Sequence, residues 1–167
     1  MDHEAEAIDR LICAGDLSQA QAALDLWVKS HPQELALAAH WKAWIDRKLG
    51  RDDAALATLT EIIDRGIDNK VLCLSARADL YFTLGRFDQA INDYRRILAS
   101  TDEAVIEFFR DYANFRIALV LARRGASEFL NYRDALPADY SSWIDGGFVS
   151  TADLSSIFGR ASRASKR

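Results

Sequence analysis

The 167-residue sequence has few residues that break helices. It contains only two prolines and eight glycines, whereas a β-sandwich or barrel needs many turn residues. Its two cysteines, Cys13 and Cys73, have no CxxC spacing, and no apolar run is long enough to span a membrane. The N-terminus also lacks the apolar core of a secretory signal. These absences predict a helical, cytoplasmic protein in which both cysteines are buried, reduced thiols.

The motifs of common enzyme and metal-binding classes are also missing. The sequence has no GxSxG, HExxH, GxGxxG or phosphate-loop pattern. His3, His31 and His40 share no ligand spacing with one another or with either cysteine. We therefore predict no catalytic residues, no metal and no cofactor.

Charge is unevenly distributed along the chain. The net charge is −4, yet residues 1–70 alone hold 13 acidic and 8 basic residues. The last ten residues contain four basic residues and no acidic one. The overall balance disfavours nucleic acid as a partner, and we expect the basic end to be a solvated, frayed terminus.

A repeat of 35 residues runs through the first hundred positions. Three segments align without gaps: LICAGDLSQAQAALDLWV (11–28), DRKLGRDDAALATLTEII (46–63) and YFTLGRFDQAINDYRRIL (81–98). Gly15, Gly50 and Gly85 keep this interval. Each glycine follows an apolar helical stretch and can take the left-handed conformation that ends a helix. A fixed period of this length predicts stacked helical hairpins, since one hairpin cannot bury its apolar face alone.

The pattern resembles the tetratricopeptide repeat family, most clearly at residues 80–98. The matching positions are Ala78, just before this segment, and Tyr81, Gly85, Phe87, Ala90 and Tyr94 within it. The resemblance implies an all-α fold, a right-handed α-solenoid of helix–turn–helix repeats at about 1–35, 36–70 and 71–102. The family's usual interval is one residue shorter, and Lys42 and Asp46 stand where it has apolar residues.

After residue 102 the register changes. Residues 103–124 predict a long amphipathic helix that ends at Gly125, and residues 126–136 predict its partner, giving a degenerate fourth pair over 103–137. Residues 138–150 are interpreted as a loop. Residues 151–162 predict a short helix, with Ser150 or Thr151 as its N-cap, that covers the end of the stack, followed by the basic tail.

The family resemblance also implies a concave groove, lined by the first helix of each pair, that holds a partner's peptide or helix. Register from the three glycines places nine candidate residues there: His40, Trp41, Trp44, Arg47, Asp79, Phe82, Tyr112, Phe115 and Arg116. Some members of the family hold a C-terminal carboxylate with bases and amides, but this sequence has Glu6, Asp9, Trp41, Trp44, Ala76 and Asp79 at the positions concerned. We therefore predict a non-enzymatic adaptor, assembly factor or chaperone whose partner is a protein segment with apolar anchors and some basic character.

Several alternatives stay open at this point. Trp41 and Trp44 fall at helical spacing and fit a core as well as a groove, and the same holds for Phe82, Tyr112 and Phe115. A second functional hypothesis is self-assembly, with helix 103–124 or the C-terminal segment docked on a neighbouring copy. An enzyme without recognisable motifs and a nucleic-acid-binding tail are further alternatives.

Overall fold

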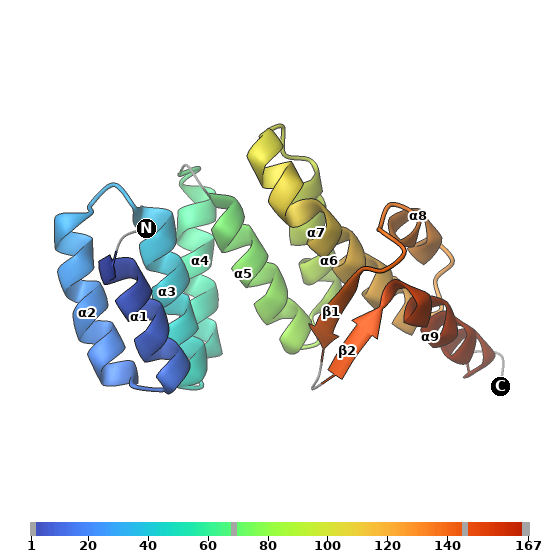
Figure 1. Cartoon of the computed structure of the whole chain (residues 1–167), viewed down its shortest axis with the longest axis horizontal. Helices are drawn as coiled ribbons and strands as arrows, with labels where there is room; N and C mark the ends of the chain where they lie inside the picture. The colour runs from blue at the N-terminus through green and yellow to red at the C-terminus, as the bar shows by residue number, and fades with distance from the viewer. Residues whose placement is uncertain (1–2, 68–69, 145–146, 165–167) are drawn as a thin grey trace. The chain divides into compact units, whose positions relative to one another are not determined.

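The computed structural model describes residues 3–67, 70–144 and 147–164, and within them the chain is mostly helical (Figure 1). Among the described residues, strands occur only after Tyr140. The helical class predicted from the sequence is therefore confirmed, with one short hairpin as the exception. The chain divides after Leu84 into two compact units, which are described separately below.

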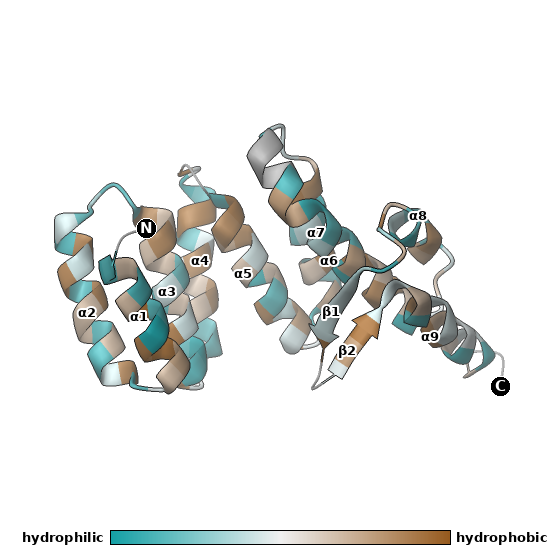
Figure 2. Cartoon of the chain, in the orientation of Figure 1, coloured by the Kyte–Doolittle hydropathy of each residue, from teal (hydrophilic) through white to brown (hydrophobic). Residues whose placement is uncertain are grey.

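The first unit contains five helices. They are α1 (His3–Ala14), α2 (Leu17–Ser30), α3 (Leu35–Lys48), α4 (Asp52–Asp64) and α5 (Lys70–Thr83). α1 packs on α2 and α3 packs on α4, and α3 also contacts both α1 and α5. In Figure 2 each of these helices carries both hydrophilic and hydrophobic residues, as expected of amphipathic helices packed against one another.

The repeated glycines end helices in the predicted way. Gly15 and Gly50 have φ angles of +85° and +73°, a region that a Cβ atom disfavours. After α1, the N–H of Asp16 donates to the carbonyl of Leu11 at 3.0 Å. After α3, the N–H of Arg51 donates to the carbonyl of Asp46 at 2.8 Å. Both patterns satisfy carbonyls that the helix end would otherwise leave unpaired.

The core of the first unit is built around two tryptophans. Trp27 and Trp41 meet edge to face, with ring centroids 4.8 Å apart. The other buried members of this cluster are Ile8, Ile12, Ala20, Leu24 and Ile45. Asp46 is also buried, and its carboxylate pairs with the ammonium of Lys42 one turn earlier on α3. This pair explains how two charged residues fit at positions where the repeat pattern calls for apolar ones.

The two cysteines lie in different environments. Cys73 is buried, as predicted, and its thiol donates to the carbonyl of Ala36 at 3.4 Å. Burial raises the pKa of this thiol to about 11, so it stays protonated at neutral pH. Cys13 is exposed, and the prediction that it is buried was wrong. It follows the buried Ile12 by one position and lies outside the face that α1 packs inward.

The second unit combines helices with a hairpin. Its elements are α6 (Phe87–Leu98), α7 (Glu103–Arg123), α8 (Phe129–Arg133), β1 (Ser141–Ile144), β2 (Gly147–Ser150) and α9 (Thr151–Ala164). α7 contacts α6, α8 and α9 and supplies more buried hydrophobic residues than any other described element of this unit. Its fully buried side chains include Phe115, Ile117 and Leu119. Phe129 of α8 stacks on Phe158 of α9, with ring centroids 4.7 Å apart.

Two predictions for this region were wrong. Residues 126–136 do not form a full partner helix, because only Phe129–Arg133 is helical. Residues 138–150 are not simply a loop, because β1 and β2 pair antiparallel within them, with Trp143 opposite Phe148.

The final helix agrees with its prediction. α9 begins at Thr151, and Ser150 is its N-cap. The hydroxyl of Ser150 accepts from the N–H of Asp153 at 3.3 Å, and the carboxylate of Asp153 accepts from the N–H of Ser150 at 2.9 Å. This reciprocal pair is a capping box, which fixes the start of the helix.

Candidate binding pocket

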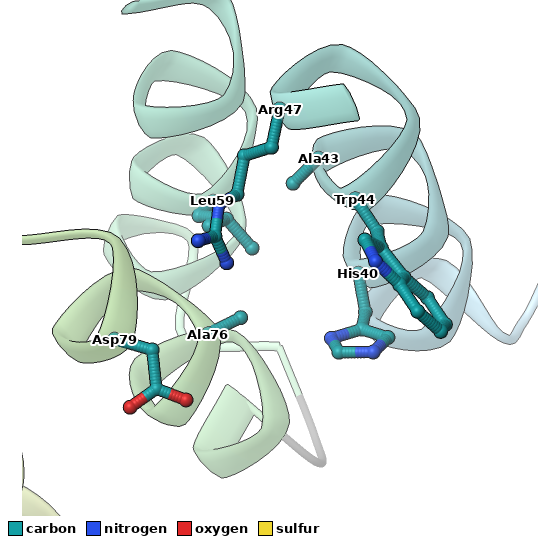
Figure 3. Close-up of a pocket in the computed structure, with 7 residues that line it drawn as sticks. All are labelled: His40, Ala43, Trp44, Arg47, Leu59, Ala76 and Asp79. Atoms are coloured by element: carbon teal, nitrogen blue, oxygen red, sulfur yellow. The ribbon is translucent and has the colours of Figure 1, made fainter. Parts of the chain in front are cut away.

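A pocket of about 260 Å³ lies between α3 and α5 in the first unit (Figure 3). Its lining residues are His40, Ala43, Trp44, Arg47, Leu59, Ala76 and Asp79. His40, Trp44 and Arg47 are spaced at i, i+4 and i+7, so they share one face of α3. Leu59 of α4 and the small side chains of Ala43 and Ala76 form an apolar floor between the two polar walls.

Four of the nine predicted site residues meet in this pocket: His40, Trp44, Arg47 and Asp79. They come from α3 and α5, which the repeat register predicts to be the first helices of the second and third pairs. The apolar floor was not among those nine residues. Alanine at two facing positions, 43 and 76, is the sequence signal for it, because small side chains leave space between neighbouring helices.

Trp41 and Phe82 lie elsewhere in the first unit. Trp41 is 2% exposed, and its indole N–H donates to the carboxylate of Asp9 at 2.7 Å. Phe82 is 8% exposed. Side chains with so little exposed surface are not available as anchors for a partner. Trp41 and Phe82 are therefore core residues, which is one of the two positions that the sequence allowed for them.

The remaining three predicted site residues belong to the second unit. Phe115 is fully buried, with its ring 5.4 Å from that of Tyr140. Tyr112 is half-buried, and its ring lies edge-on to that of Tyr94 at 6.2 Å. The guanidinium of Arg116 stacks over Tyr112 at 5.0 Å. These contacts give Phe115 a core position and leave only parts of Tyr112 and Arg116 at the surface.

Opposite charges occupy the two walls of the pocket. Arg47 projects from α3 and Asp79 from α5, with the apolar floor between them (Figure 3). The guanidinium of Arg47 has no hydrogen-bond or ion-pair partner within the described ranges. Its donors are therefore available to a ligand that enters from solvent.

His40 is neutral at pH 7. Burial lowers the pKa of its imidazole, and Arg47 lowers it further, against the opposing effect of the carboxylates of Asp9 and Asp79. Its Nδ1 atom is buried and has no hydrogen-bond partner in the described part of the chain. Because an unpaired buried N–H is rarer than an unpaired acceptor, we assign the proton to Nε2. In this tautomer the imidazole of His40 can donate one hydrogen bond from Nε2.

This lowered pKa gives a pH-dependent stability. As the pH falls through the ordinary histidine range, the unfolded chain binds a proton at His40 before the folded chain does. We expect the free energy of unfolding to fall between about pH 7 and pH 5, and to fall less in His40→Gln, which cannot titrate there. Urea unfolding at both pH values measures the difference. Equal pH dependence in the two proteins would contradict the neutral assignment.

Comparison with family models, curated proteins and solved structures finds no match to the chain. No described helix is both long and apolar enough to cross a lipid bilayer. Within the described residues, no three His, Cys, Asp or Glu side chains gather as a group that could hold a metal ion.

Proposed function

We propose that the protein is a non-enzymatic binding module that holds a segment of another protein in the α3–α5 pocket. In this proposal the helical hairpins are tetratricopeptide-like repeats of a right-handed α-solenoid, and the pocket is part of the groove formed by their first helices. The protein would act as an adaptor, an assembly factor or a chaperone for its partner.

The pocket itself is the observation that supports this proposal. Small-molecule sites commonly have volumes of roughly 300–1,000 Å³, so a pocket of about 260 Å³ suits a single side chain better than a cofactor. Its apolar floor can bury that side chain, while Arg47 and Asp79 can hydrogen-bond the polar groups beside it.

Trp44 is the residue best placed to contact the partner. It is half-buried, and its ring lies 6.2 Å from that of His40, so the two rings form one wall of the pocket. An aromatic side chain of this kind buries a large area at little entropic cost. The partner segment then supplies an apolar side chain for the floor and polar groups for the charged walls.

Selection from a random peptide library tests the proposal. Peptides displayed on phage are selected on the immobilised full chain, and their affinities are then measured by isothermal titration calorimetry. We expect Trp44→Ala and Arg47→Ala to weaken the selected peptides by about tenfold to a hundredfold, as removal of central contacts does.

A matched control is available in Phe108→Ala. Phe108 is 79% exposed on α7 in the second unit, so its removal should leave peptide affinity unchanged. Peptides that bind the Trp44 and Arg47 variants as tightly as the wild-type chain would place the binding site elsewhere. Circular dichroism confirms that each variant is folded before affinities are compared.

A further inference from the structure

The β1–β2 hairpin displays two large aromatic side chains. Trp143 is 58% exposed and Phe148 is 73% exposed. They are directly opposite in the register, and their rings meet edge to face at 5.0 Å. Paired aromatics at the surface of a hairpin are typical of an interaction site, because each buries a large apolar area on binding.

The α3–α5 pocket has the chemistry to receive an indole ring. Its apolar floor matches the ring face, and Arg47 can stack over it, as Arg124 stacks over Phe87 at 5.7 Å elsewhere in this chain. Asp79 can accept the indole N–H. The same kind of bond already occurs between Trp41 and Asp9 at 2.7 Å.

We propose that the occupant of this pocket is Trp143 of a second copy of the chain, with Phe148 packed beside it. The proposal rests on the proposed function of the pocket as a binding site and names its partner. The result is a head-to-tail interface, in which the pocket of one copy holds the hairpin of the next.

Electrostatic attraction favours contact between the first unit of one copy and the second unit of another. Residues 1–84 hold 14 acidic and 9 basic residues, a net charge of −5, whereas residues 85–167 hold 11 acidic and 12 basic residues, a net charge of +1. α9 directly follows the hairpin and carries Arg160 and Arg163, both exposed. Between two copies, the acidic first unit of one therefore attracts the basic C-terminal segment of the other. Contacts of this kind form open chains or closed rings according to their geometry.

Light scattering over a range of concentrations tests the interface. We expect the average mass of the wild-type chain to rise with concentration and to fall again as salt is added. The double variant Trp143→Ala/Phe148→Ala should associate with a dissociation constant raised about thirtyfold or more, as loss of central aromatic contacts implies. Phe108→Ala removes an aromatic side chain outside the hairpin that is even more exposed than Trp143 or Phe148, and this variant should associate as the wild type does.

Mixing two defective variants gives the sharper result. Trp44→Ala lacks the pocket wall and the double variant lacks the hairpin, so each should be monomeric alone. Together they retain one intact pocket and one intact hairpin, and should form a one-to-one dimer that grows no further. N-acetyl-tryptophanamide should compete with this dimer. A wild-type chain that stays monomeric, or a hairpin variant that associates normally, would overturn the proposal.

Peptide selection separates this proposal from the proposed function. The hairpin variant keeps the pocket intact, so it should bind the selected peptides at least as tightly as the wild-type chain. If peptides bind through Trp44 while the wild-type chain stays monomeric, the second copy is the wrong partner and the binding module stands. If Trp44→Ala changes neither peptide binding nor association, both proposals fail.

Discussion

Trp41→Ala is expected to lower the free energy of unfolding of the first unit by about 3–5 kcal/mol, the usual cost of deleting a buried tryptophan side chain. Trp41 is 2% exposed and packs edge to face on Trp27. Its removal leaves a cavity among Ile8, Ile12 and Leu24, which belong to the same core cluster. Three of the four tryptophans lie in this unit, so the fluorescence change during urea unfolding reports mainly on it.

Trp44→Ala is the matched control for this substitution. Trp44 lies three residues further along α3 but is half-buried at the pocket. Its loss should cost about 1 kcal/mol, as is common for partly exposed side chains. The expected contrast is therefore a large loss of stability in one variant and a small loss with weakened peptide binding in the other. Equal destabilisation by both substitutions would contradict the different positions of the two rings.

The comparison of Trp41 with Trp44 shows how far the sequence predicts the site. Both residues lie on the face of α3 that the repeat register predicts to be inward or groove-facing. Trp41 becomes a core residue because Trp27 of α2 packs against it. That contact depends on how two successive hairpins cross, and helical periodicity within α3 does not determine the crossing angle. The register therefore identified the helix face but not the individual residue exposed there.

Local backbone chemistry explains why the helix boundaries were predictable. Gly85 and Gly125 have φ angles of +71° and +68°, like the two earlier glycines of the series. A residue that ends a helix in this conformation is nearly always glycine, so the signal is local and strong. The capping box at Ser150 and Asp153 is equally local.

The β1–β2 hairpin also has a local sequence signal, which the loop interpretation of residues 138–150 missed: the two residues between the strands are Asp145 and Gly146, and Asp-Gly is a preferred two-residue hairpin turn. Each strand has only four residues, and the sequences SSWI and GFVS are too short for a clear alternation. Its formation depends on contacts with the rest of the second unit, where Ile144 is buried and α9 packs against β2. The residues that carry our further inference therefore lie in a segment whose turn signal was present in the sequence, although its strands are short. The turn residues favour the hairpin locally, and tertiary contacts stabilise its short strands.

Phe115→Ala is expected to destabilise the second unit by about 3–5 kcal/mol, because the fully buried ring leaves a large cavity when it is removed. The surrounding side chains are not expected to fill this cavity. Ile117 and Leu119 are fully buried on the same helix, and a close-packed core collapses only partly into a void. Hydrogen exchange of the α7 amides measures the loss, since it reports on this unit directly.

Phe108→Ala makes the same chemical change on the same helix at a site that is 79% exposed. We expect it to alter stability by less than about 0.5 kcal/mol, as surface substitutions usually do. Comparing Phe115→Ala with Phe108→Ala measures the effect of burial alone. Both substitutions replace phenylalanine by alanine within α7, so the residue types and the change in helix propensity are the same. If the two variants lose similar stability, Phe115 is not a core residue. Its predicted role in a partner-binding groove would then have to be considered again.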